Sequence, residues 1–346
     1  MTEFVHTAVN HSIGLITLDR QKALNSLSLD MVRAITEALR AWRDNDAIRA
    51  VVIRSSGKKA FCAGGDIRFF HDAGKAAPIG GSALLEDFFT EEYALNHLIH
   101  HYPKPYIAIM DGIVMGGGMG IAQGGTSTRM RIVTERTRMA MPEVNIGLFP
   151  DVGGSYFLAR TPGEIGTYLG VTGEVIDATD ALYAGLADVF IPAAQLPALM
   201  EMLASSDNGD VRAAISSFAA AFSAQAEAAG CSLAASRATI DKHFAYDDVR
   251  AIVASLAQDA SPFAQKTLDT LRKRSPLMMC VTLAQLRRGA GMSVADCLRM
   301  ERVMVRRSFE QGEVLEGIRS VVIDKDNNPK WMPPTLEEVT PTMVAR

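Results

Sequence analysis

Residues 109–156 constrain the fold and chemistry of this chain more than any other stretch. Gly116, Gly117 and Gly118 follow soon after the apolar run Tyr106–Met110, which is typical of a buried strand. Glycines let a ligand approach the backbone closely, and N–H groups at a helix start can bind developing negative charge. The glycine run therefore predicts an oxyanion site.

Two carboxylates follow the glycine run. Glu143 lies inside the apolar residues 139–146, and Asp151 follows it between Pro150 and Val152. A carboxylate among apolar neighbours tends to have a raised pKa and can act as a base near neutral pH. Two plainer interpretations stay open, namely a solvated loop acid at Glu143 and an ordinary turn residue at Asp151.

The first half of the chain alternates expected strands, helices and glycine loops. Ser28 suits the N-cap of a helix whose apolar residues recur from Met31 to Trp42. Other helices are expected at residues 84–98, 164–169 and 178–186, and strands at residues 13–18, 50–53, 106–110, 130–133 and 188–191. This order is typical of an α/β layered domain.

The character of the chain changes near residue 195. From there to about residue 310 only helical patterns occur, at residues 196–203, 263–271, 277–286 and 294–309. We therefore expect an α/β core at residues 1–195 and a helical C-terminal region at residues 196–346 that packs on the core.

Charge and composition argue against several classes of function. The 35 Lys and Arg against 39 Asp and Glu give a net charge of −4 without a dominating basic block, so no nucleic-acid partner is expected. No apolar run could span a bilayer and the start lacks a signal-peptide pattern, so we expect a cytoplasmic protein without a membrane partner. The cysteines and histidines lack metal-ligand spacing, so no metal site is expected, and Cys62 is interpreted as a core residue.

Motifs of common nucleotide-binding and hydrolytic folds are also absent. No P-loop motif occurs. The GxSxG motif of a serine hydrolase is also absent, because the residue two positions after Ser155 is not glycine. Gly118 and Gly120 lack the third glycine of a dinucleotide-binding fingerprint.

Several ordered segments resemble a known family. AFCAGGDI (60–67), IMDGIVMGGGMG (109–120) and MPEVNIGLFPDVGGSYFL (141–158) are similar to the crotonase (enoyl-CoA hydratase/isomerase) superfamily. EEYALN (91–96), GLFPDVGGSYFL (147–158) and LEGIRSVVIDKDNNPKW (315–331) resemble its 3-hydroxyisobutyryl-CoA hydrolase branch. The resemblance covers most of the chain. It implies an α/β spiral of repeated ββα units, a helical C-terminal region and an acyl-CoA thioester ligand.

The resemblance also implies roles for individual residues. The two N–H donors to the thioester oxygen correspond to Gly65 and Gly117, and the catalytic carboxylate to Glu143. Two further acids that contact the acyl group correspond to Glu92 and Asp151, although a glutamate on a helix is usually solvated. Residues matching those that line CoA are Lys22, Ala23, Leu24, Ala63, Asp66 and Ile67. No separate cofactor is implied, because CoA is part of the substrate.

Two departures from the family pattern bear on the reaction. Enoyl-CoA hydratases carry a second glutamate three residues after the middle glycine of the triple, where this chain has Gly120. Syn addition of water to an enoyl group uses two carboxylates, so this departure favours the hydrolase branch. Residues 122–132 (AQGGTSTRMRI) are longer than is usual in that branch.

The expected function is hydrolysis of 3-hydroxyisobutyryl-CoA in valine breakdown, with 3-hydroxypropionyl-CoA as a second substrate. The alternatives are an enoyl-CoA hydratase or isomerase and, in another class, a non-catalytic acyl-CoA-binding protein or a nucleic-acid-binding relative. The intact Glu143 argues against the binding protein and the net charge against the nucleic-acid binder. Whether Glu143 activates water or attacks the carbonyl itself stays open. Family members form trimers and hexamers, so a homo-oligomer is one expectation.

Overall fold

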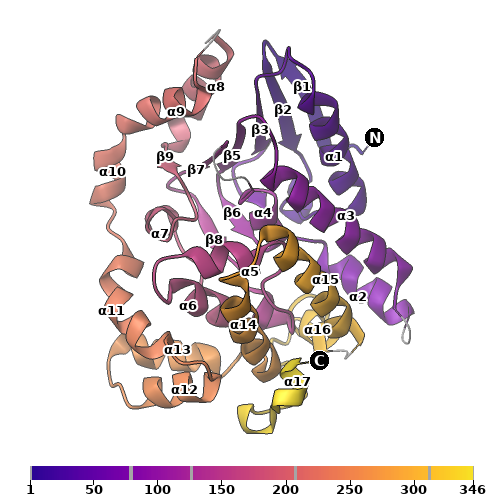
Figure 1. The fold of residues 1–346 in the computed structure, drawn as a ribbon, viewed down its shortest axis with the longest axis vertical. Helices are drawn as coiled ribbons and strands as arrows, with labels where there is room; N and C mark the ends of the chain where they lie inside the picture. The colour runs from indigo at the N-terminus through magenta and orange to yellow at the C-terminus, as the bar shows by residue number, and fades with distance from the viewer. Residues whose placement is uncertain (1, 78–80, 125–127, 206–208, 311–312, 346) are drawn as a thin grey trace. The chain divides into compact units, whose positions relative to one another are not determined.

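The computed structural model describes residues 2–77, 81–124, 128–205, 209–310 and 313–345 (Figure 1). Its strands are β1 (Val5–Asn10), β2 (Ile13–Leu18), β3 (Ala50–Ser55), β4 (Ala60–Cys62), β5 (Tyr106–Met110), β6 (Ile113–Met115), β7 (Arg129–Val133), β8 (Arg138–Ala140) and β9 (Val189–Phe190). The helices up to residue 183 are α1 (Leu29–Arg43), α2 (Ile67–Ala76), α3 (Ala83–His100), α4 (Gly117–Gly120), α5 (Gly154–Phe157), α6 (Ile165–Thr172) and α7 (Ala178–Tyr183).

Beyond residue 195 the described part of the chain forms helices and connecting segments without strands. These helices are α8 (Leu196–Ser205), α9 (Val211–Ala220), α10 (Ser223–Ala228), α11 (Ser232–Phe244), α12 (Val249–Ala257), α13 (Pro262–Leu271), α14 (Pro276–Gly289), α15 (Val294–Glu310), α16 (Glu313–Ile318) and α17 (Pro341–Ala345). The expected helical C-terminal region is therefore confirmed.

The strands form two sheets, and neighbouring strands along the chain often belong to different sheets. The larger sheet has the order β1-β2-β3-β5-β7-β9, in which β1 and β2 are antiparallel and the later neighbours are parallel. The smaller sheet has the order β4-β6-β8. In each of the consecutive pairs β3–β4, β5–β6 and β7–β8, the first strand belongs to the larger sheet and the second to the smaller sheet. This alternation is expected for repeated ββα units.

Apolar side chains on the helices explain how the larger sheet is covered. Ser28 caps α1 by accepting a hydrogen bond from the Met31 N–H, as the sequence predicts. Trp42 of α1 packs so closely on β2 that a Cβ at Gly14 would lie 2.5 Å from its ring. Buried residues of α8 and α9, including Leu199 and Ile215, join the core formed by the central strands.

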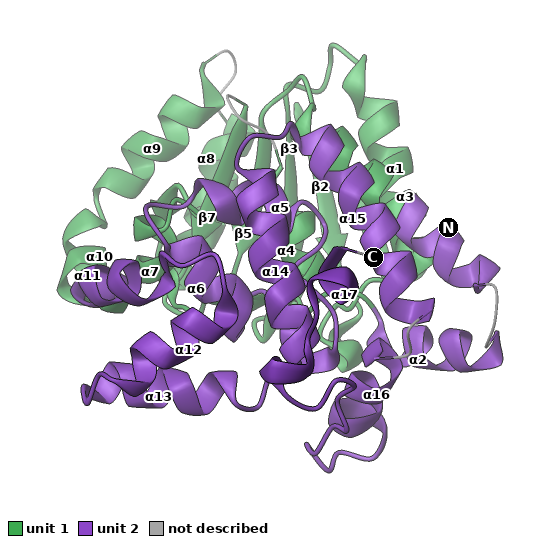
Figure 2. Ribbon diagram, turned by 60° about the horizontal axis from the view of Figure 1, so that its bottom comes forward, with its two compact units in different colours: residues 1–65, 91–139, 176–232 green, residues 66–90, 140–175, 233–346 purple. Residues whose placement is uncertain are grey.

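The chain divides into two compact units that interleave along the sequence (Figure 2). Unit 1 comprises residues 1–65, 91–139 and 176–232, and unit 2 comprises residues 66–90, 140–175 and 233–346. The boundary expected at residue 195 follows a change in secondary structure, and as a domain boundary it stays a prediction.

Two features are absent from the residues that the structure describes. None of their helices is both long enough and apolar enough to cross a membrane. No group of three or more of their His, Cys, Asp and Glu side chains could hold a metal ion. Residues 125–127, within the segment that departs from the family pattern, lie outside the described residues.

Candidate active site

Two glycine loops of unit 1 bring the expected oxyanion donors side by side. A Cβ added at Gly117 would lie 3.3 Å from the backbone nitrogen of Gly65, and one added at Gly64 would lie 3.5 Å from that of Gly117. Gly64 and Gly116 have φ values of 102° and 49°, which side-chain-bearing residues rarely adopt. Across the described residues, neither the Gly65 nor the Gly117 N–H donates a hydrogen bond. Two neighbouring backbone donors are thus available to a ligand oxygen.

The third glycine of the run has a different role. A Cβ at Gly118 would lie 2.2 Å from the carbonyl oxygen of Cys62, so this position serves close packing. Burial, with a smaller contribution from the charge of Glu92, raises the pKa of the Cys62 thiol to about 12, and a hydrogen bond to the Gly64 carbonyl oxygen opposes the rise. Cys62 is therefore a protonated core residue, as the sequence suggests.

Glu92 lies beside the two amides. It belongs to α3, its side chain is 2% exposed, and its Oε1 would be 2.6 Å from a Cβ at Gly117. The preceding residue, Glu91, points elsewhere and forms an exposed ion pair of 2.6 Å with Arg33. The solvated-glutamate interpretation therefore fits Glu91 and not Glu92.

Asn96 is a candidate residue that the sequence analysis missed. It lies one helical turn after Glu92, so both side chains project from the same face of α3. It is 4% exposed, and its side-chain oxygen and nitrogen lack hydrogen-bond partners among the described residues. Buried polar groups without partners are costly and often serve a ligand. The only sequence signal was its place at the end of EEYALN.

Glu143 opens a short 3-10 helix of unit 2, Glu143–Ile146, and Gly147 closes it with a φ of 69°. We call residues 143–147 the Glu143 turn. Glu143 is 6% exposed, which excludes a fully solvated loop acid. The Ser275 N–H donates to the Val144 carbonyl oxygen at 3.2 Å. A Cβ at Gly147 would lie 2.5 Å from the carbonyl oxygen of Glu313, so only glycine fits there.

Asp151 lies in a second turn of unit 2, residues 150–155, which we call the Asp151 loop. The carbonyl oxygen of Asp151 accepts a hydrogen bond of 2.6 Å from the Gly154 N–H, and Asp151 is 5% exposed. Val152 and Gly153 both have positive φ, at 50° and 91°. Asp151 therefore begins a turn and is also buried, and its contact with the substrate stays a prediction.

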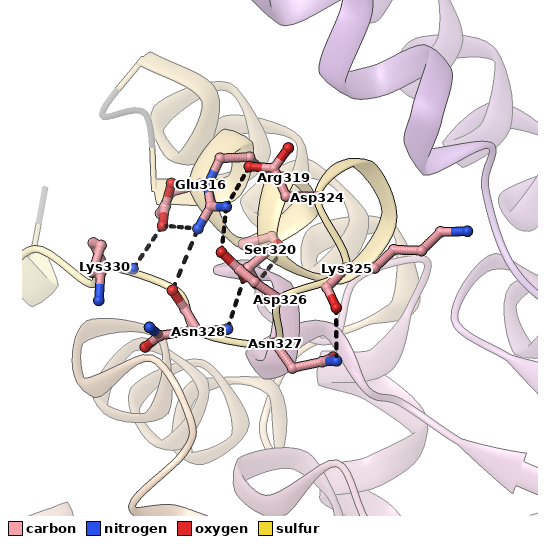
Figure 3. Close-up of polar contacts among 10 residues, drawn as sticks. Glu316, Arg319, Ser320, Asp324, Lys325, Asp326, Asn327, Asn328 and Lys330 are labelled. Atoms are coloured by element: carbon pink, nitrogen blue, oxygen red, sulfur yellow. Dashed lines mark hydrogen bonds and ion pairs between the residues drawn. The ribbon is translucent and has the colours of Figure 1, made fainter.

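The C-terminal segment that resembles the hydrolase branch lies against the Glu143 turn. A Cβ at Gly147 would lie 3.0 Å from the ring of Trp331, and one at Gly317 would lie 2.2 Å from the carbonyl carbon of Ile146. Arg319 organises the segment before Trp331 (Figure 3). Its guanidinium donates to carboxylates of Glu316 (2.8 Å), Asp324 (2.6 Å) and Asp326 (2.8 Å) and to the Asn328 carbonyl oxygen (3.3 Å). This segment therefore has a structural role within unit 2.

A buried carboxyl group also adjoins the Glu143 turn. Glu313 is 5% exposed, and its Oε1 accepts a hydrogen bond of 2.6 Å from the Ser275 hydroxyl. Burial raises the pKa of Glu313 to about 7, while the Ser275 hydrogen bond opposes the rise. The same Ser275 hydroxyl caps α14 through the Met278 N–H.

The residues expected to line CoA divide between the units. In unit 1, Lys22 and Ala23 lie in the 3-10 helix Gln21–Ala23, and the Leu24 carbonyl oxygen accepts the Ala63 N–H at 3.0 Å. This bond holds residues 22–24 beside the loop that leads to Gly65. In unit 2, Asp66 caps α2 through the Phe69 N–H, and Ile67 begins that helix. Their contact with CoA stays a prediction.

Comparison with known proteins gives a consistent relationship. The chain matches the Enoyl-CoA hydratase/isomerase family over residues 13–346. A relative named 3-hydroxyisobutyryl-CoA hydrolase, mitochondrial, from Xenopus tropicalis is 43% identical over 331 residues, covering 94% of this chain and 84% of that protein. The Homo sapiens protein of the same name is 37% identical over 330 residues, covering 94% and 83%.

Solved structures resemble the chain along nearly its whole length. One is of a carnitinyl-CoA dehydratase from Mycobacterium thermoresistibile, with a TM-score of 0.88, 38% identity and coverage of 99% of this chain and 96% of that one. Another is of an enoyl-CoA hydratase from Rhodobacter sphaeroides 2.4.1, with a TM-score of 0.86, 37% identity and the same coverage. These likenesses confirm the expected fold class.

Proposed function

Because the chain belongs to the enoyl-CoA hydratase/isomerase family, we propose that it hydrolyses a short 3-hydroxyacyl-CoA thioester, with 3-hydroxyisobutyryl-CoA as the main substrate. Water and the thioester would give the free hydroxy acid and CoA, a reaction that belongs to valine breakdown. The relatives named 3-hydroxyisobutyryl-CoA hydrolase support this substrate. The structural observation that carries the proposal is the pair of unused amides at Gly65 and Gly117 beside Glu92.

The amide pair would act on the thioester oxygen. Its N–H groups would polarise the carbonyl and stabilise the oxyanion, and one such donor is worth about 3–4 kcal/mol at the barrier. Glu143 would activate water or attack the carbonyl to form an anhydride that water then opens. Glu92 and Asp151 would hold the acyl hydroxyl or the attacking water. The CoA thiolate is a leaving group that needs little protonation, so the proposal requires no histidine acid.

A hydratase is the second candidate, because two similar solved structures are of a carnitinyl-CoA dehydratase and an enoyl-CoA hydratase. Gly120 argues against it, since hydration of an enoyl group would use a second carboxylate at that place. Crotonyl-CoA distinguishes the two. Rapid loss of the enoyl absorbance without thiol release would favour the hydratase.

The direct test is thiol release from 3-hydroxyisobutyryl-CoA, followed with a thiol-reactive dye across a panel of acyl-CoAs. Glu143→Gln should fold normally and lose most of this activity, and near-normal turnover would rule out its catalytic role. Glu92→Gln should also lose activity. The adjacent Glu91→Gln is its matched control, because Glu91 is exposed and paired with Arg33.

Two further expectations need their own measurements. The curated relatives carry the word mitochondrial in their names, and the cytoplasmic location expected here stays a prediction that cell fractionation would check. The homo-oligomer also stays a prediction, and light scattering during size-exclusion chromatography would measure it.

A further inference from the structure

Two side chains from α14 and α15 hold the Asp151 loop on both sides of Asp151. The two carboxylate oxygens of Glu301 accept hydrogen bonds from the Gly153 N–H at 2.8 Å and the Ser155 N–H at 2.9 Å. On the other side, Gln285 Nε2 donates to the carbonyl oxygen of Pro150 at 2.6 Å. All these residues belong to unit 2.

The backbone between these contacts is strained. Val152 has a φ of 50°, and a β-branched residue is a true outlier in this region. Such a conformation costs about 1–3 kcal/mol and persists only when its surroundings hold it. The residue next to Asp151 therefore needs the contacts that Glu301 and Gln285 supply.

Glu301 is an unusual group to find in this position. It is completely buried, and no ion pair involves it within the part of the chain that the structure describes. Burial raises its pKa to about 8, the hydrogen bonds from Ser155 and Gly153 lower it, and the charge of Asp151 raises it. Both oxygens nevertheless accept hydrogen bonds from loop amides, an arrangement that fits the ionised form, because a protonated carboxyl would place a hydrogen opposite one of the two N–H groups. A glutamine could accept only one of these two N–H groups.

We propose that Glu301 is a positioning residue that fixes the orientation of the Asp151 carboxylate by holding the Gly153 and Ser155 amides. Gln285 completes the arrangement by holding the Pro150 carbonyl. The inference rests on the proposed function, since it assumes that Asp151 contacts the acyl group or the attacking water. A plain structural anchor would instead stabilise the fold without acting through Asp151.

A double-mutant cycle separates these two roles. Glu301→Gln keeps the side-chain size but offers one acceptor and places a donor opposite the other N–H. We expect kcat for 3-hydroxyisobutyryl-CoA to fall tenfold to about a hundredfold, because misplacement by about 1 Å can cost that much. KM should change by less than about threefold, because Asp151 is proposed to act on the acyl group or the attacking water and not on the CoA moiety. In the Asp151→Asn background the same change should have almost no further effect.

Two other variants complete the set. Glu310→Gln is the matched control, because Glu310 is an exposed acid on the same helix, and it should keep wild-type kcat. Gln285→Met removes the donor to Pro150 at similar volume. It should lower kcat less than Glu301→Gln does, and it keeps the proposal testable if Glu301→Gln does not fold.

Hydrogen exchange gives a readout that does not need activity. Glu301→Gln should speed exchange at the Gly153 and Ser155 amides while the thermal midpoint stays close to that of Glu310→Gln. An equal loss of kcat with and without Asp151, or unchanged exchange at the two amides, would overturn the proposal. If the wild type releases no thiol, the proposed function fails, and the exchange result alone then decides whether Glu301 holds the loop.

Discussion

Replacing Gly117 by alanine tests the amide pair most directly. The added methyl carbon would lie 3.3 Å from the Gly65 nitrogen and 2.6 Å from Glu92 Oε1. It would therefore occupy the space beside both donors that a thioester oxygen needs. Gly117 is not among the glycines with positive φ, and alanine is the best helix former, so the backbone should accept the change.

The expected magnitude follows from these contacts. Loss of one oxyanion donor typically costs about 10²–10³ in kcat, so thiol release by Gly117→Ala should fall at least about a hundredfold. The thermal midpoint should stay near that of the wild type, because the atom that must move is the far end of the Glu92 side chain and the Gly117 backbone does not have a positive φ.

Two other glycine variants are compared with Gly117→Ala in this measurement. Gly291→Ala is the matched control, because a Cβ there meets no atom within 4 Å, and it should keep both activity and stability. Gly118→Ala should unfold the protein, because its methyl carbon would lie 2.2 Å from the Cys62 carbonyl oxygen. Near-wild-type turnover by Gly117→Ala would refute the assignment of these amides to the thioester oxygen.

Three further predictions concern two buried residues, Glu313 and Asn96, and Arg319, which forms several hydrogen bonds. Glu313 has a folded-state pKa raised to about 7, so its stabilising effect is full below its unfolded pKa and is lost as pH rises through 7. Denaturant titrations should therefore show that the wild type loses up to about 3 kcal/mol relative to Glu313→Gln between pH 4 and pH 8, at about 1.4 kcal/mol per pKa unit; equal pH slopes would contradict this. Asn96→Leu should raise the unfolding free energy by about 1–3 kcal/mol, because it removes unpartnered polar atoms, and should lower thiol release; unchanged turnover would exclude a role for Asn96. Arg319→Lys should speed proteolysis within residues 324–331, because an ammonium cannot replace the five donors of the guanidinium; an unchanged digestion pattern would contradict this.

Local patterns predicted much of the secondary structure. The helix starting after Ser28 has the expected cap and buried face, and strands β2, β3, β5 and β7 lie where apolar runs predicted them. Strands β4, β6 and β8 were missed because three residues are too few to show a period of two. Strand β1 was missed because it is almost entirely exposed, which leaves it without an apolar signal.

Helices α9 to α12 were expected only as part of a helical region. The alanine-rich α10 has helix propensity but no large apolar residue to mark a face. Both glycine loops could be identified from the sequence, although the separate packing role of Gly118 depends on Cys62, which lies 56 residues earlier.

The residues that hold the two acidic turns could not be predicted locally. Glu301 and Glu313 look like ordinary helix acids, because burial of a helical glutamate is decided by distant segments. Glu301 accepts a hydrogen bond from Gly153, which is 148 residues earlier in the chain. Ser275 donates its N–H to the carbonyl oxygen of Val144, which is 131 residues earlier.

These long-range contacts give the helical C-terminal residues a role in the chemistry. Within unit 2, Ser275 and Glu313 contact the Glu143 turn, and Gln285 and Glu301 hold the Asp151 loop. Both acids of the proposed mechanism therefore depend on residues 275–313 for their local geometry. A chain ending near residue 195 would keep the amide pair of unit 1, but Val152 would lose the contacts that hold its strained backbone. The change in secondary structure at residue 195 is thus a boundary between kinds of element, while the acidic turns and the late helices form one folded unit.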